Sequence, residues 1–291
     1  MGMQINTNVS ALNAYRNLSN TQNDLSKSLE KLSSGLRINR AADDAAGLAI
    51  SEGLRSQVNG LNVAARNAQD GISVIQTAEG ALTEVHSILQ RMRDLAVQGA
   101  NGSNNTESLD AIQTEADQLS IELWRISQST NFNGIDLMKG GSLTFQVGSD
   151  GDTTTAGVNT VSVDLTDLTV ALTGVTATGA LMGTDATTAG TGFAVDTAAN
   201  AANTIELIDE AISNVSTSRA TLGAAQNRFE STINSLNVSA ENLSAAESRI
   251  RDTDMASEMV KYTAANILSQ AGTAMLAQAN QSTQGVLQLL Q

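Results

Sequence analysis

A long apolar repeat without proline constrains this chain more than any other feature of its sequence. From Leu54 to Ala96, apolar residues recur in steps of three and four, with one irregular step between Ile75 and Ala78. Such spacing is typical of a helix that packs along one face, as in a coiled coil. As a helix this stretch would span about 65 Å, since each residue adds about 1.5 Å. Proline, which breaks helix interiors, is absent from all 291 residues. The sequence therefore predicts a helical rod.

A second repeat in the other half of the chain predicts a partner for this rod. It runs over residues 205–250 with the same spacing, and a shorter repeat occupies residues 109–126. Glycines at 99 and 102 predict a turn between the first rod and the shorter helix. Helices joined by short turns lie antiparallel, so we expect a long antiparallel coiled coil or helical bundle.

The middle of the chain has a different composition. Residues 140–218 contain no Lys or Arg and are rich in Thr, Gly, Asp and Ala. Apolar and polar residues alternate over 143–147 and 161–165, which is the pattern of half-buried strands, and turn residues follow the first of them at 148–153. The predicted fold class is mainly α, a long rod with a small β-hairpin insert. We expect residues 171–203 to be polar loop or weak strand.

Both ends of the chain are amphipathic but almost without charge. Residues 1–23 carry one charge, Arg16, and residues 262–291 carry none, although their apolar residues keep helical spacing. A pair of thin helices leaves most of its apolar stripe exposed, so we expect the ends to become ordered on assembly with other chains. The alternative is one closed bundle, in which the C-terminal helix covers Val9, Leu12, Leu18, Leu25, Leu29, Leu32 and Leu36.

Composition opposes several classes of function. The net charge of −14 and the isoelectric point near 4.4 disfavour a nucleic-acid partner, and no apolar run is long enough to span a membrane. With no Cys and one His, we expect no catalytic, cofactor or metal site, and no enzyme. The N-terminus lacks the pattern of a cleaved signal peptide, so we expect cytoplasmic residence or signal-independent export.

Some acidic residues have simple structural interpretations. Asp43 and Asp44 precede the first rod and are typical of a helix N-terminus. Asp150 and Asp152 have calcium-loop spacing but lack the closing Glu, which favours a hairpin turn.

Several ordered stretches together resemble bacterial flagellin, in a short form with a reduced variable middle region. The resemblance covers about residues 1–150 and 203–291. It rests on INTNVSALNAYRNL, LSSGLRINRAADDAAGLAIS, RNAQDGISVIQTAEGAL, LQRMRDLAVQGANG, NFNGIDL, LGAAQNRFESTINSL and SRIRDTDMASEM, with the tail ILSQAGTAMLAQANQ.

The resemblance implies five segments. They are 1–44, the N-terminal part of an inner-tube coiled coil plus a linker; 45–140, the N-terminal helices of an outer-tube bundle; 141–203, the hairpin and short variable insert; 204–253, the C-terminal helix of that bundle; and 254–291, the C-terminal helix of the inner tube.

The resemblance also implies roles for individual residues. Those implied to pack in the inner tube are Leu12, Leu18, Leu25, Leu29, Leu32, Ile267, Leu268, Met275, Leu276, Val286 and Leu287. An export chaperone would bind Ile267, Leu268, Met275 and Leu276, and a Toll-like innate immune receptor of a host would recognise Arg91, Leu95 and Glu115.

The function implied is a structural subunit that self-assembles into the flagellar filament used for swimming. It would leave the cell by type III export without a cleaved signal peptide, be extracellular, and meet cap and hook-junction proteins. Two alternatives stay open. A hook–filament junction protein would share the terminal helices, and a secreted coiled-coil binding protein or adhesin would use the Thr-rich middle as its ligand surface.

Overall fold

The computed structural model describes residues 8–150, 158–172 and 192–289, with the backbone alone at 198 and 282–289. The chain divides into two compact units. The first, called here the terminal unit, consists of Met1–Val58 and Glu241–Gln291. The second, the bundle unit, consists of Asn59–Ala240.

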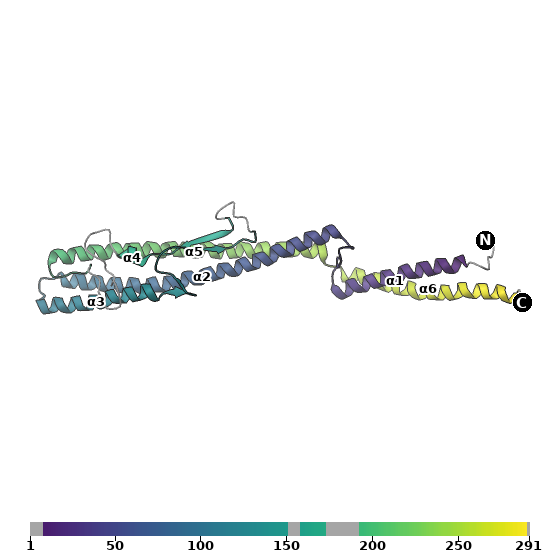
Figure 1. The fold of residues 1–291 in the computed structure, drawn as a ribbon, viewed down its shortest axis with the longest axis horizontal. Helices are drawn as coiled ribbons and strands as arrows, with labels where there is room; N and C mark the ends of the chain where they lie inside the picture. The colour runs from purple at the N-terminus through teal and green to yellow at the C-terminus, as the bar shows by residue number, and fades with distance from the viewer. Residues whose placement is uncertain (1–7, 151–157, 173–191, 290–291) are drawn as a thin grey trace. The chain divides into compact units, whose positions relative to one another are not determined.

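Two antiparallel helices form most of the terminal unit, α1 (Val9–Ser34) and α6 (Met255–Leu289), and they lie side by side along their length (Figure 1). α1 begins at Asn8, whose side chain accepts a hydrogen bond from the Ala11 amide, and ends at Gly35 in the left-handed conformation. Asp254 caps α6 by accepting hydrogen bonds from the amides of Ala256 and Ser257.

Three helices run along the bundle unit (Figure 1). They are α2 (Ala45–Gly99), α3 (Thr106–Ser129) and α5 (Ala198–Arg251), of which α2 and α5 also extend into the terminal unit. The predicted rods and the turn after Gly99 are therefore confirmed. Asp44 starts α2 by accepting the Gly47 amide at 2.9 Å, as its position before the apolar repeat predicts.

The predicted repeats supply the core of the bundle unit. Their buried members include Ala68, Ile75, Ala78, Leu82, Val85, Leu89, Met92 and Ala96 of α2, Ile112, Ala116 and Leu123 of α3, and Ile208, Val215, Leu222 and Phe229 of α5. Phe229 packs edge-on against Phe145, with ring centroids 5.5 Å apart. One contiguous apolar core thus joins the helices to the insert.

The predicted hairpin is present as β3 (Ser142–Gln146) and β4 (Thr160–Asp164), paired antiparallel. Leu143 pairs with Val163 and Phe145 with Val161, so the apolar alternation matches the register. Of the predicted turn at 148–153, residues 151–153, with Asp152, lie outside the described residues. A short helix, α4 (Leu168–Leu172), follows β4.

Two features of the middle differ from the prediction. A second small hairpin, β1 (Asn131–Phe132) with β2 (Ile135–Asp136), turns at Asn133 and Gly134, both with positive φ. Within the expected polar loop 171–203, residues 173–191 lie outside the described residues, but Phe193 and Val195 are buried in the core. The Thr204 hydroxyl fixes this stretch by bonding the amide and carbonyl of Ala194. Burial of Phe193 and Val195 therefore attaches these residues to the core, although the stretch around them is mostly polar.

The limits of the two units fall inside continuous helices. The resemblance implies segment limits at 44/45 and 253/254, and the compact units divide at 58/59 in α2 and 240/241 in α5. No turn or glycine cluster marks these positions, because each helix continues through them.

Candidate assembly surface

The helix pair of the terminal unit exposes an unusual amount of apolar surface. Ten large apolar side chains of α1 and α6 are between 47% and 68% exposed. They are Val9, Leu12, Tyr15 and Leu29 of α1, and Met255, Met259, Val260, Ile267, Leu268 and Met275 of α6. We call these ten residues the assembly surface. Exposed apolar side chains in such number are typical of an interaction site in soluble proteins.

The structure places the predicted packing residues on this pair but buries none of the described ones fully. Leu12, Leu29, Ile267, Leu268 and Met275 belong to the assembly surface, and Leu18, Leu25, Leu32 and Leu276 are half-buried between the helices. The side chains of Val286 and Leu287 lie outside the described residues. The half-buried group holds α1 to α6, and the exposed group faces outward without a partner in the described part of this chain.

A shallow groove follows the helix pair next to the assembly surface. Small and polar residues line its α1 side, namely Ser10, Ala14, Asn17 and Thr21, and its α6 side includes Ala271 and Gly272. Leu268 and Met275 of the assembly surface form the rim. Small residues let another helix approach closely, so the shape suits a further helical chain.

Polar links tie the two terminal segments together where the helices end. The Thr253 amide donates to the Gly35 carbonyl at 3.0 Å, and the Arg37 side chain donates to the Ile250 carbonyl at 2.7 Å. Arg251 forms an ion pair with Glu52 at 2.6 Å. These contacts join residues 35–52 to residues 250–253, which are about 200 residues away in the sequence.

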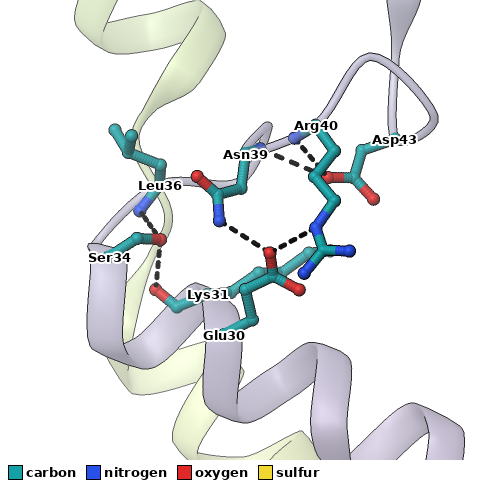
Figure 2. Close-up of polar contacts among 7 residues, drawn as sticks. All are labelled: Glu30, Lys31, Ser34, Leu36, Asn39, Arg40 and Asp43. Carbon is teal, nitrogen blue, oxygen red and sulfur yellow. Dashed lines mark hydrogen bonds and ion pairs between the residues drawn. The ribbon is translucent and has the colours of Figure 1, made fainter.

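The linker between α1 and α2 is folded around two carboxylates (Figure 2). Glu30 accepts hydrogen bonds from the side chains of Asn39 and Arg40, each at 2.7 Å. Asp43 accepts the backbone amides of the same two residues at 3.2 and 3.0 Å. The hydrogen bond from Arg40 and that from Asn39 hold the pKa of Glu30 below its ordinary value of 4.5. The two backbone hydrogen bonds lower the pKa of Asp43 in the same way.

We expect the linker to loosen in acid. A carboxyl whose pKa is lowered in the folded state stabilises the fold above its ordinary pKa, and this contribution is lost as the pH falls through the lowered value. Arg40→Gln should therefore raise the Glu30 pKa towards 4.5, as followed by its carboxyl ¹³C resonance. Lys27→Gln, which removes a cation of the same unit that is not bonded to Glu30, is the control. An unchanged Glu30 titration in Arg40→Gln would contradict this assignment.

Charge is distributed very unevenly between the units. The terminal unit contains nine Lys and Arg against ten Asp and Glu, whereas the bundle unit contains seven against 20. The terminal unit is therefore nearly neutral, and copies of it can approach one another without strong repulsion. The repulsion between copies resides in the bundle unit.

The residues implied for recognition by a host receptor lie in the bundle unit. Arg91 and Glu115 form an ion pair at the surface, with the Arg91 Nε 2.8 Å from a Glu115 oxygen and both side chains about half exposed. Leu95 is only 1% exposed and belongs to the core. In this conformation Arg91 and Glu115 are accessible to a partner, whereas Leu95 is not.

The described residues contain no cluster of side chains suited to binding a metal ion. His86 Nε2 lies 2.9 Å from the Gln90 amide, and no group of three or more His, Asp and Glu that could hold a metal is present in these ranges. Within the same residues, no helix is both long and apolar enough to cross a membrane.

Sequence reasoning missed the polar contacts of the terminal unit. Glu258 is buried against Ser28, 230 residues away, and Glu30 organises the linker. The sequence held one signal for Glu258. Ala265, Gly272 and Ala279 of α6 are small and lie seven residues apart, and Glu258 occupies the preceding position of this repeat.

An acidic bundle joined to a neutral, apolar-faced helix pair defines a self-assembling coiled-coil subunit. The family model for the bacterial flagellin N-terminal helical region matches residues 5–142. The family model for the bacterial flagellin C-terminal helical region matches residues 205–290. The chain belongs to the bacterial flagellin family.

Relatives match along their whole length. A flagellin of Halalkalibacterium halodurans is 51% identical, and one of Bacillus subtilis is 49% identical. A flagellar filament 33 kDa core protein of Treponema phagedenis is also 49% identical. Each comparison covers 99% of this chain and 100% of the relative. The short middle region is thus shared with full-length relatives.

Proposed function

We propose that copies of this chain build the filament of a bacterial flagellum by packing their terminal units together. The observation that carries the proposal is the assembly surface, ten exposed apolar side chains on two helices with almost no net charge. The names of the relatives support the same role. A junction protein or adhesin has no such support.

Assembly is driven by burial of the assembly surface. Burying one large apolar side chain contributes about 1.5–3 kcal/mol, so even partial burial of ten of them contributes strongly. One face of each copy packs against a different face of the next copy. When such contacts do not close into a ring, their repetition generates a helical filament. The near neutrality of the terminal unit lets these units form the packed interior, while the acidic bundle units stay further apart.

Terminal order is coupled to assembly in this proposal. Ordering a residue costs about 1–2 kcal/mol of backbone entropy. A lone helix pair with most of its apolar face in water recovers little of that cost, so the free ends fray and become ordered in the filament. Closely related packings of the same helices would let the filament change its supercoil.

Further partners follow from the same surface. An export chaperone covers Ile267, Leu268, Met275 and Leu276 before assembly, and three of these four belong to the exposed set. The chain leaves the cell unfolded through type III export, is extracellular, and meets cap and hook-junction proteins at the filament ends. A structural role of this kind needs no enzymatic activity.

Host recognition would use the bundle unit. A Toll-like receptor would contact Arg91 and Glu115 at the surface, while Leu95 is buried in the core of the same unit. Since these residues lie in a unit that does not carry the assembly surface, recognition and assembly would depend on different residues.

The proposal is tested by seeded polymerisation of the double variant Ile267→Gln, Leu268→Gln. We expect its critical concentration to rise about 100-fold, because two side chains lose roughly 3 kcal/mol of burial between them. Light scattering gives the critical concentration, and electron microscopy identifies filaments. Val170→Gln makes the same polarity change at a valine that is 71% exposed in the bundle unit and should assemble like the unaltered chain. Equal assembly of all three chains would refute the proposal.

A further inference from the structure

We propose that Glu258 is a positioning residue that fixes the register in which α6 pairs with α1. Register decides which members of the assembly surface face a neighbouring copy. The inference rests on the assembly function proposed above, and it adds a specificity determinant to it.

Glu258 is the one buried charged side chain among the described residues, only 4% exposed. The Ser28 hydroxyl of α1 donates to its Oε1 at 2.8 Å, and Lys261 Nζ lies 3.1 Å from its Oε2. Burial, the largest influence, would raise the pKa of Glu258, but these two hydrogen bonds together with the positive charges of Lys261 and Lys31 outweigh it, and the pKa lies below its ordinary value. The carboxylate is therefore held ionised between the helices.

The small residues that share a stripe of α6 with Glu258 do little to specify a register. Positions 258, 265, 272 and 279 of α6 are seven residues apart and recur on the same face, and the last three are Ala265, Gly272 and Ala279. A slide by seven residues would replace one small side chain by another. Leu18 lies against Gly272, where an added Cβ would stand 3.7 Å from the Leu18 Cβ. An alanine can therefore take this place after a small shift of Leu18.

Within this stripe of α6, Glu258 is the residue that distinguishes the registers. A slide that brings Glu258 opposite Gly35 removes the Ser28 hydroxyl and leaves the carboxylate with Lys261 alone, whereas the opposite slide exchanges Ser28 for Thr21. Loss of a hydrogen bond to a buried charge is more costly than exchanging alanine for glycine. A single buried polar group that specifies register is a known device of coiled coils. The backbone hydrogen bond from Thr253 to Gly35 and the bond from the Asn8 side chain to the Ala279 carbonyl favour the same register, and Glu258 adds a charged contact to them.

Cysteine pairs can measure the register, because the chain has no cysteine of its own. Leu18→Cys with Gly272→Cys reports the observed register, since the 3.7 Å Cβ separation suits a disulfide. Leu18→Cys with Ala265→Cys, or with Ala279→Cys, reports a slide of seven residues either way. Each pair is placed in the unaltered, Glu258→Leu, Glu258→Gln and Glu241→Leu backgrounds. Filaments are oxidised, and intramolecular products are quantified on non-reducing gels.

We expect Glu258→Leu to lower the ratio of observed-register to shifted product about tenfold, the effect of losing a hydrogen bond to a charged group. Glu258→Gln, which still accepts from Ser28, should keep most of the ratio. Glu241→Leu, which removes an exposed carboxylate outside the helix pair, should keep all of it. A merely stabilising role for Glu258 would lower the total yield without producing shifted products.

The inference is overturned if Glu258→Leu retains the observed register alone, or if the unaltered chain shows no preference among the three pairs. Should Glu258→Leu fail to assemble, the same products are measured in the unassembled chains. Absence of filaments from the unaltered chain would refute the proposed function, whereas normal filaments with an unchanged register in Glu258→Leu would refute this inference alone.

Discussion

A chain lacking residues 262–291 is expected to form no filaments under conditions in which the intact chain grows from seeds. The deletion removes Ile267, Leu268 and Met275, which are each at least 60% exposed on α6. Loss of three such contacts, at about 1.5–3 kcal/mol each, raises the critical concentration at least about 1,000-fold. The shortened chain also leaves Leu18 without Gly272, so α1 loses its partner over most of its length.

Thermal unfolding of the bundle unit is the control for this deletion. Every residue of its core lies outside 262–291, so the shortened chain should show the same main unfolding transition by circular dichroism. Light scattering and electron microscopy then report assembly alone. Filaments of ordinary length from the shortened chain would contradict the role of the tail. If the intact chain also fails to polymerise and its ends resist proteolysis, the closed bundle is the correct interpretation.

The division between the two units separates stability from assembly. The bundle unit has a continuous apolar core that includes α2, α3, α5 and both hairpins, and it carries most of the negative charge. The terminal unit has few buried apolar residues, among them Ile38 and Ala265, and leaves its larger side chains exposed. In a chain built in this way, the residues that stabilise the bundle unit are separate from the exposed apolar side chains of the terminal unit.

Much of the fold is predictable from sequence because its elements depend on local periodicity. The repeat from Leu54 to Ala96 and the alternation around Leu143 and Val161 each repeat with the period of their own secondary structure, and both predictions are confirmed. The hairpin at Asn133 was missed although Asn-Gly is a turn signal, because its strands have only two residues each. The burial of Phe193 could not be predicted, since it depends on a core assembled from distant helices.

The assembly surface could also be predicted in part, because it too depends on the spacing of apolar residues along each helix. Uncharged apolar ends are visible in the sequence, and the structure places Leu12 and Ile267 on an exposed face. The contacts of Glu258 and Glu30 were not predictable, because they depend on Ser28 and Arg40 in the folded unit. Patterns within a helix reveal which face is apolar, whereas partners across helices appear only when the register is known.

Among the substitutions considered in the bundle unit, Phe229→Ala is expected to cause the largest loss of stability. Phe229 is fully buried on α5, meets Phe145 edge-on, and lies directly over Gly71 of α2. Truncating a buried phenylalanine costs about 3–5 kcal/mol through lost burial and the cavity that remains. The main unfolding transition should fall by about 10 °C for a unit of this size. Val238→Ala, at a 58% exposed valine of α5, should change it little.

Gly71 provides a sharper test of the same contact. A Cβ at position 71 would lie only 2.9 Å from the Phe229 Cζ, so Gly71→Ala should destabilise the unaltered chain by about 1–3 kcal/mol through overpacking. In the Phe229→Ala background the obstructing ring is gone, and the higher helix propensity of alanine, about 1 kcal/mol, should make the same change stabilising. The sign of the effect therefore reverses between the two backgrounds. Equal destabilisation in both would show that the glycine is required for a reason other than the ring of Phe229.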